Sequence, residues 1–553
     1  MKCAVLLWFV AINYVQSELP PSCKSPIYCH GELLHTVQMA RIFNDGKHFV
    51  DLKMKNNENQ TLLNFQVLQK KYNYEIPSSE LLLFVDKNFE DGNELESYNL
   101  TDLNLSPPFL KEITNQTVQN FAKDLLKIWP QLVRRVRAEV INDPSSYSFI
   151  PVPNPFIIPG GRFREYYYWD SYWIIDGLLL SGMNEMARGM VENFISIVKE
   201  IGFIPNGGRI YYLKRSHPPL LTFMAHLYYR ETKNVTWLKQ NIDTLAQELE
   251  FWNSRSVQVR RGERAYTLYQ YKAVSQGPRP ESYREDFLTA SFFNETAQQL
   301  QTYVNLKSGA ESGWDFSNRW IFDQFGGNLA NLSHIEITRL IPVDLNAFLC
   351  GAFRNIADLY TVLGNSSQSS IWYNKFLEIR EATATILWNR QDNIWYDYDL
   401  KLSKHRRKFY PSNLAPLWAK CFPREKGHKL GRRAVAYLRK EGVLNYAGGV
   451  PSSLDNTGEQ WDFPNAWAPL QDIVVQGLHN TRYPPALRLA STIAKTWVKS
   501  NMLAFRSTGA MFEKYDAGVA GKYGGGGEYE VQSGFGWSNG VALRFIYDYY
   551  REL

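Results

Sequence analysis

Cysteine and histidine are scarce in this chain, and their spacing excludes the common metal-binding motifs. The 553 residues include five cysteines and nine histidines, and no C-x-x-C pair or His/Cys cluster has the spacing of zinc ligands. We therefore expect no metal and no other cofactor. Cys23 and Cys29 are close together in a loop-like stretch, which predicts a local disulfide in an oxidising compartment. We expect Cys350 and Cys421 to be buried free thiols.

A strong charge of one sign is also absent. The formal net charge of +6 is small for this length. The basic clusters "KHRRK" at 404–408 and "RRVR" at 134–137 are short, and acidic residues are spread along the rest of the chain. We interpret the clusters as solvated faces and expect no nucleic-acid partner.

Long apolar runs are missing, and the longest one near the N-terminus is short. Residues 4–15 form an apolar run after Lys2, and Val15 and Ser17 suit a small-residue cleavage site. Residues 1–17 are therefore predicted to be a secretory signal peptide. The run is too short to span a bilayer, and no later stretch reaches about 18 uninterrupted apolar residues. We expect a soluble, secreted protein without a membrane anchor.

Sequons for N-linked glycosylation agree with secretion. Because such tripeptides also arise by chance, only some are expected to carry a glycan. The eight candidates are Asn59, Asn99, Asn104, Asn115, Asn234, Asn294, Asn331 and Asn365.

Strict alternation of apolar and polar residues is rare, whereas helical periodicity is common. In 117–140, apolar residues recur every three or four positions and form one stripe, which predicts a helix over that whole range. Residues 186–199, 343–363, 370–387 and 485–503 show similar patterns. No low-complexity linker divides the chain after residue 40, so we predict a single, mostly α-helical domain over residues 18–553, with long glycine- and proline-rich loops that carry the function.

Two motifs in the C-terminal segment resemble nucleotide and serine-hydrolase sites, and both interpretations fail. The run Gly524–Gly527 lacks the G-K-[ST] ending of a P-loop, because Lys522 is followed by Tyr523, and the nearby carboxylates would repel phosphate. "GWSNG" at 536–540 matches G-x-S-x-G, but no histidine follows Ser538. The hydrolase order Ser, Asp/Glu, His is therefore impossible.

Paired carboxylates are the remaining candidates. Five loop-like stretches combine arginine, acid and aromatic residues beside glycine or proline, which is the composition expected of a sugar site. A single stretch of this kind is usually a structural ion pair, but five in one chain favour a polyol site. They are "PGGRFREYYYWDSY" (159–172), "NGGRIYYLKRSHPP" (206–219), "GPRPESYRED" (277–286), "ESGWDFSNRW" (311–320) and the C-terminal segment around 511–540.

These stretches resemble the trehalases, the glycoside hydrolases specific for α,α-trehalose. "PGGRFREYYYWDSYW" and "QWDFPNAWAPLQ" (460–471) match the two signature segments of that family, and the other motifs follow in the family's order. The resemblance extends from about residue 25 to the end and is strongest to the secreted insect-type trehalases. It implies an (α/α)6 toroid of paired helices and an inverting hydrolysis of trehalose to two glucose molecules.

The resemblance also implies roles for individual residues. The general acid falls on Asp315 of "ESGWD" and the general base on Glu513 of "EKYD". An acid that donates a proton near neutral pH needs a raised pKa, which burial beside Trp314 would supply. The residues that match the family's substrate-binding positions are Arg162, Trp169, Asp170, Asn206, Arg215, Ser216, His217, Arg279, Pro280, Glu281, Gly313 and Glu528.

One position departs from the family pattern. The family usually has "RSQPP" where this chain has "RSHPP", so His217 replaces a glutamine. Because histidine titrates near pH 6.5, we expect His217 to give substrate affinity a pH dependence. The competing interpretation is that His217 changes affinity slightly and nothing else.

Two alternative functions remain open at this point. One is a catalytically silent trehalose-binding relative, and the other is an (α/α)6 glucosidase for a different α-glucoside. The presence of both candidate catalytic carboxylates disfavours the first alternative. We further expect Gly524–Gly527 to belong to a flexible loop that folds over the bound disaccharide.

Overall fold

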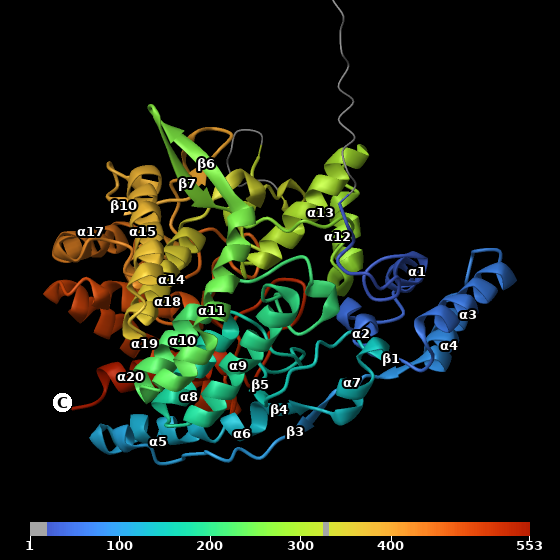
Figure 1. Ribbon diagram of the computed structural model, residues 1–553, viewed down its shortest axis with the longest axis horizontal. Helices are drawn as coiled ribbons and strands as arrows, with labels where there is room; N and C mark the ends of the chain where they lie inside the picture. Colours follow the sequence, from blue (N-terminus) through green and yellow to red (C-terminus); the bar gives the residue numbers. More distant parts are fainter. Residues whose placement is uncertain (1–18, 324–330, 553) are drawn as a thin grey trace, which may run out of the picture.

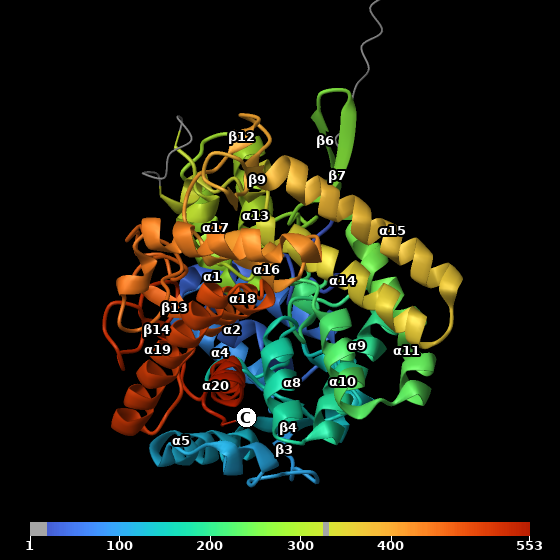
Figure 2. The ribbon, with the colours of Figure 1, turned by 90° about the vertical axis from the view of Figure 1, so that its left-hand side faces the viewer.

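A closed ring of six helices forms the centre of the protein. The computed structural model describes residues 19–323 and 331–552. In Figure 1 the chain is coloured from its N-terminus to its C-terminus, and in Figure 2 the inner helices lie around a common centre. Neighbours around the ring are in contact in the order α8, α10, α14, α16, α18, α20 and back to α8. The bounds are α8 Asp170–Leu180, α10 Leu221–Thr232, α14 Val343–Val362, α16 Ala415–Trp418, α18 Ala468–Asn480 and α20 Gly536–Tyr549.

A second set of six helices packs outside this ring. Each outer helix precedes an inner one in the chain, so outer and inner helices alternate. This arrangement confirms the (α/α)6 toroid. The outer helices are α5 Gln116–Leu126, α9 Asn184–Ile201, α11 Val235–Phe251, α15 Ser366–Ala382, α17 Gly427–Lys440 and α19 Pro484–Thr508.

The burial patterns of the helices explain their places in the two rings. The outer helix α17 buries Leu430, Val435 and Leu438 on one face and exposes Arg432 and Arg439 on the other, as expected of an amphipathic surface helix. The inner helix α14 is buried nearly all round. A helix without a polar face needs neighbours on every side, and the inner ring provides them.

The continuous helix predicted over 117–140 is wrong. The structure has α5, then the short α6 Trp129–Leu132, the strand β4 Val133–Val136 and α7 Ala138–Asn142. Pro130 has no backbone N–H and cannot continue α5, so the helix restarts there. After α6, β4 pairs with β3 Leu95–Ser97 and β5 Phe156–Ile157.

Five further small antiparallel sheets join the helices, an addition to the expected helical fold. The pair that matters most for the site is β13 Asn465–Trp467 with β14 Lys514–Asp516, which places the segments "QWDF" and "EKYD" side by side. The other pairings are β1 Leu52–Met54 with β2 Phe89–Asp91, β6 Ser256–Arg261 with β7 Arg264–Tyr269, β9 Trp388–Asn389 with β10 Ile394–Trp395, and β11 Tyr398–Asp399 with β8 Leu340–Ile341 and β12 Lys404–His405.

The N-terminal helices build a smaller core of their own. The helices α1 Glu32–Ala40, α2 Gly46–Val50, α3 Glu58–Lys71 and α4 Ser78–Asn88 lie beside the toroid in Figure 1, as do α12 Tyr283–Ala290 and α13 Thr296–Glu311. Their apolar cluster includes Tyr167, Tyr211 and Tyr212, which belong to loops of the toroid. Because the two parts share buried side chains, we keep the proposal that residues 18–553 form one domain.

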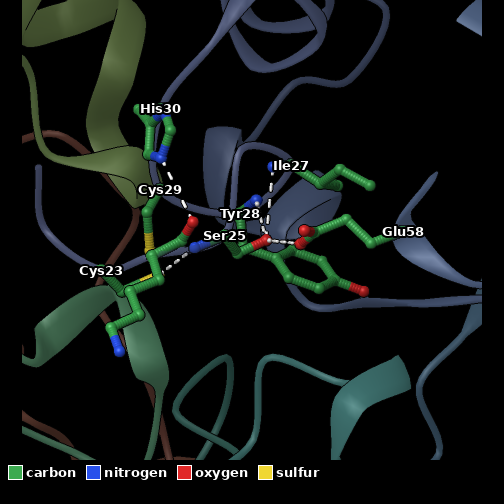
Figure 3. Close-up of a disulfide and its surroundings, with 8 residues drawn as sticks. Cys23, Ser25, Ile27, Tyr28, Cys29, His30 and Glu58 are labelled. Atoms are coloured by element: carbon green, nitrogen blue, oxygen red, sulfur yellow. Dashed lines mark hydrogen bonds between the residues drawn. A yellow bond between two sulfur atoms is a disulfide. The ribbon is translucent and has the colours of Figure 1, made fainter. Parts of the chain in front are cut away.

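Two disulfides occur, and one of them corrects a prediction. Cys23 and Cys29 are bonded, as expected. Figure 3 shows that the loop around them is held to α3, because the Ser25 hydroxyl donates to Glu58 at 2.9 Å. Cys350 of α14 is bonded to Cys421, 71 residues later, so the prediction of two free thiols is wrong. Both cysteines are buried at the contact of α14 with the end of α16, a proximity that sequence separation does not reveal.

The sequons lie at the surface. Six of the eight asparagines are exposed, and Asn104 and Asn234 are half-buried. The predicted signal peptide, residues 1–17, lies outside the described residues. Within residues 19–323 and 331–552, no helix combines the length and the hydrophobicity needed to cross a membrane.

Candidate active site

A cavity lies where the inner helices begin. Asp170 is the first residue of α8, Trp537 is the second residue of α20, and Trp467 directly precedes α18; all three line the cavity. The remaining lining residues come from the loops that lead into the ring. The fold therefore brings sequence segments hundreds of residues apart to one opening.

Twelve of the fourteen predicted catalytic and substrate-binding residues line this cavity. The other two, Ser216 and Pro280, lie beside it. The Ser216 hydroxyl donates to the Ile204 carbonyl at 2.7 Å, and the Pro280 carbonyl accepts from Gln38 at 3.0 Å, so both have structural contacts. The twelve lining residues are Arg162, Trp169, Asp170, Asn206, Arg215, His217, Arg279, Glu281, Gly313, Asp315, Glu513 and Glu528.

Asp315 follows the end of α13 in a sharp turn. Gly313 has a φ of +78°, and a Cβ there would meet the Trp169 ring at 2.7 Å, so only glycine fits. Trp314 is buried and stacks on Trp461 with ring centroids 5.4 Å apart. Burial raises the pKa of Asp315 to about 7, against the opposing effect of Arg279. Asp315 therefore holds a proton near neutral pH, as expected beside Trp314.

Glu513 lies at the start of β14 and is held by hydrogen bonds on several sides. The Tyr529 hydroxyl donates to Oε1 at 2.7 Å, and the Gln532 N–H donates to Oε2 at 3.4 Å. The Glu513 carbonyl accepts from Trp537 Nε1 at 2.9 Å. Burial raises the pKa of Glu513, whereas Lys514, Tyr529, Gln532 and Arg162 act in the opposite direction. These four neighbours favour the ionised carboxylate.

Asp170 is electrostatically coupled to both of these acids. Burial raises its pKa well above the usual value, and the charges of Glu513 and Asp315 raise it further. This coupling requires the three carboxyl groups to lie near one another in a poorly hydrated space. Not all three can ionise at low cost, so at least one retains a proton.

Ion pairs fix the cationic side chains around the cavity. Arg215 contacts Glu281 at 2.5 Å; burial alone would raise the pKa of Glu281, but Arg215 and Arg279 lower it. Arg279 pairs with Asp286 at 2.7 Å and with Glu528 at 2.9 Å. These rigid forks present donors and acceptors to the cavity, which suits vicinal sugar hydroxyls.

Asp45, a residue that was not predicted to belong to the site, holds the predicted Arg162 in place. Arg162 donates to its two carboxylate oxygens at 2.9 and 2.7 Å. The guanidinium also lies 4.6 Å from the centre of the Tyr529 ring, so it supports the tyrosine that bonds Glu513. Another buried arginine, Arg319, does not line the cavity and pairs with Asp344 and Asp397.

The aromatic wall of the cavity was missed. Trp461 stacks on Trp467 with ring centroids 3.8 Å apart, and both line the cavity. They belong to "QWDFPNAWAPLQ", which indicated the family resemblance. No residue of that segment was predicted to line the site. Phe163, Tyr529, Phe535 and Trp537 complete this wall.

The glycine-rich segment continues into Glu528 and Tyr529, which line the cavity, and several bonds hold it in place. Glu528 bonds Arg279 and accepts from the Ser282 hydroxyl at 3.1 Å. Lys514 Nζ donates to the Gly526 carbonyl at 3.1 Å. Asp516 pairs with Lys522 at 3.0 Å, which gives it a role at the base of the loop. The segment thus contacts the base candidate, a substrate-site arginine and the neighbouring strand at once.

Comparison with known proteins agrees with this geometry. The trehalase family profile matches residues 41–550. The chain is 51% identical to the trehalase of Tenebrio molitor, over 97% of both chains. The chain belongs to the trehalase family. It is also 45% identical to the trehalases of Bombyx mori (96% of this chain, 92% of that one) and Homo sapiens (98% and 92%).

Among solved structures, the chain resembles the neutral trehalase Nth1 of Saccharomyces cerevisiae. The TM-score is 0.56 at 26% identity, over 71% of this chain and 73% of that one. The family resemblance inferred from the motifs is confirmed, and it extends beyond the insect members.

The structure contradicts the expected titration of His217. The side chain is buried against Trp169 and Tyr167, and its Nδ1 has no hydrogen-bond partner within the described part of the chain. Burial, with Arg215, lowers the pKa of His217 well below 6.5. The imidazole is therefore neutral throughout the range in which a free histidine would titrate.

The variant His217→Gln tests this conclusion. We expect KM to change by less than about tenfold, and by the same factor at every pH between 5.5 and 8, because neither side chain changes charge there. Steady-state kinetics across that range measure the ratio, with the surface variant His30→Gln as the control. A KM ratio that changes sigmoidally near pH 6.5 would contradict the neutral imidazole.

Proposed function

We propose that this protein hydrolyses α,α-trehalose to two glucose molecules with inversion at the attacked carbon. The observation that carries the proposal is the pairing, in one aromatic-lined cavity, of a protonated Asp315 with a Glu513 held by donors. An inverting glycosidase needs one carboxylic acid that protonates the leaving oxygen and one carboxylate that activates water.

Asp315 is the general acid of this mechanism. Its pKa of about 7 keeps a proton available at neutral pH. As the bond between the anomeric carbon and the bridging oxygen breaks, that proton moves to the oxygen and the first glucose leaves with its α configuration.

Glu513 is the general base. It accepts a proton from a water molecule, and the water oxygen bonds to the anomeric carbon from the opposite face, which gives the second glucose in its β form. Tyr529, Lys514 and Arg162 favour the ionised base, so they oppose the effect of burial. The other lining carboxylates and arginines hold the sugar hydroxyls.

The two alternatives gain no support from the site. A silent binding relative would not need both a buried acid of raised pKa, Asp315, and a carboxylate held by hydrogen-bond donors, Glu513, in the same cavity. Three relatives that match nearly the whole chain are called trehalases. Their names support trehalose, and not another α-glucoside, as the substrate.

We also propose that the protein is secreted and glycosylated. Two disulfides favour an oxidising compartment. The sequon asparagines lie on the surface where a glycan has room. The predicted signal peptide at residues 1–17 would direct this export.

The assignment of roles predicts the effect of two substitutions. Asp315→Asn and Glu513→Gln should each lower kcat by about 10²–10⁴-fold, the usual contribution of general acid–base catalysis, with thermal stability nearly unchanged. Glucose release measures activity, and proton NMR of the first wild-type turnovers should show α- and β-glucose in equal amounts. Glu530→Gln, an exposed carboxylate of the same loop, is the matched control. Release of α-glucose alone, or an active Asp315→Asn or Glu513→Gln variant, would exclude the mechanism.

We further propose that the glycine-rich segment is a lid. The cavity has a volume of about 90 Å³, below the ~300–1,000 Å³ of typical small-molecule sites, and an outward movement of the segment would enlarge it for a disaccharide. Closure then restores the bonds of Glu528 to Arg279 and of Tyr529 to Glu513. Lid closure and base alignment are thus the same event.

Two adjacent glycines offer a matched test of the lid. Gly526 has a φ of +78°, and a Cβ there would lie 2.6 Å from the Gly458 carbonyl oxygen. At Gly525, nothing lies within 4 Å of an added Cβ. Gly526→Ala should lower kcat/KM about tenfold, because left-handed backbone costs roughly 1–2 kcal/mol in alanine, while the unfolding temperature stays close to wild type. Gly525→Ala should have nearly wild-type kinetics. Equal kinetics for the two variants would refute the closed lid conformation.

A further inference from the structure

A second recessed region lies at the opposite end of the helix ring from the catalytic cavity. Two adjacent cavities share Arg354, Lys420, His479 and Asn480, and together form what we call the distal groove. His479 and Asn480 are the last residues of α18, whose first residues lie next to the catalytic cavity. The same is true of α8, which carries Asp170 at one end and Asp176 toward the other. The inner helices therefore connect two separate sites.

Basic side chains outnumber acidic ones in the distal groove. Arg544 is neutralised by Asp176 and lies near Asp548. Asp472 also lines the groove, but it is buried and accepts from Trp173 and Trp418. The carboxylates that then remain on the surface of the groove are Asp358 and Glu425. Opposite them are six cations: Arg230, Arg354, Arg380, Lys420, Arg424 and Arg482.

Three of these cations lie close enough to act on one another, because Arg230 and Arg482 both affect Lys420 electrostatically. Within residues 19–323 and 331–552, the side chains of Arg230, Lys420 and Arg482 form no hydrogen bond or ion pair, and the same is true of Arg380 and Arg424. Burial lowers the pKa of Lys420. Repulsion by Arg354, Arg230 and Arg482 lowers it further, whereas Asp358 acts in the opposite direction. The same positive surroundings, after burial, help to lower the pKa of His226 to about 4.

Helix ends account for part of this charge. Arg230 lies in the last turn of α10 and Arg380 in the last turn of α15, where the helix dipole favours a cation. The free carbonyls at this end, however, are bonded by Asn480 and by Arg354. Asn480 donates to Leu417 and Trp418 at the end of α16, and Arg354 donates to Ala419 at 3.1 Å. The ammonium of Lys420 and the guanidinium groups of Arg230 and Arg482 remain available to a ligand.

One wall of the distal groove is apolar. Phe376 and Phe422 are buried there, and Tyr373 and Leu487 lie beside them. The lining thus combines aromatic rings with uncommitted donors, and the Arg380 guanidinium lies 5.1 Å from the centre of the Phe376 ring. Arginine and lysine together are the usual partners of phosphate oxygens.

We propose that the distal groove binds a phosphate group, and that the apolar wall accepts an aromatic ring attached to it. The ligand class is an aromatic phosphomonoester. Phosphate supplies the negative charge that the three unpaired cations lack, and the ring replaces water against Phe376 and Phe422. This site is separate from the trehalose cavity and does not depend on the proposed catalytic mechanism.

Binding to the full-length protein tests the proposal directly. Phenyl phosphate should raise the unfolding temperature more than inorganic phosphate does, because a ligand that binds the folded state stabilises it. Phenol, and sodium chloride at matched ionic strength, should give no comparable shift. Equal shifts with phosphate and chloride would overturn the phosphate site, and equal shifts with phenyl phosphate and phosphate would overturn the aromatic part.

Variants then locate the site. Lys420→Gln combined with Arg482→Gln should raise the Kd of phenyl phosphate in calorimetry at least tenfold. Lys420 and Arg482 have left-handed backbone, as does the exposed Arg41 at the end of α1, so Arg41→Gln is the matched control and should bind normally. Unchanged binding in the double variant, or phenyl phosphate that competes with trehalose, would overturn the assignment to the distal groove.

Discussion

Removal of water from the carboxyl groups of the catalytic cavity is the constraint on which the account of this protein depends. A carboxyl group buried among aromatic rings loses the hydration that favours its charged form, and its pKa rises. Trp461, Trp467 and Trp537 line the cavity together with Asp315, and they come from segments that the inner ring brings together. The toroid matters for function because it holds these loops around one closed space.

The same burial opposes the second half of the mechanism, since the base must be charged. The structure resolves the conflict with local donors. Glu513 accepts from Tyr529 and from the backbone of Gln532, whereas neutral Asp315 has no comparable set of donors within the described residues. Two acids in one cavity thus acquire different roles through their neighbours. Because Tyr529 belongs to the glycine-rich segment, the proposed closure of that segment would also complete the base.

Motifs in the sequence predicted the site better than periodicity predicted the fold. Long ordered motifs identified twelve of the lining residues, including Asp315 and Glu513, because the chemistry of sugar recognition restricts residue types at each position. Periodicity indicated helices but missed the break at Pro130 and the small sheets, since short strands leave little pattern. Three other features depend on contacts across the fold. They are the disulfide between Cys350 and Cys421, the ion pair of Asp45 with Arg162, and the lowered pKa of His217. None of these can be read from spacing along the chain.

The pH dependence of kcat/KM for trehalose tests the central claim most directly. Asp315 must be protonated, so activity should fall as the pH rises through an apparent pKa of about 7. Glu513 must be ionised, so activity should also fall as the pH decreases through its raised pKa. The account predicts a bell-shaped profile between pH 4 and 9 with its basic limb near pH 7. A rate that stays constant from pH 6 to pH 9 would show that no buried acid of raised pKa donates the proton.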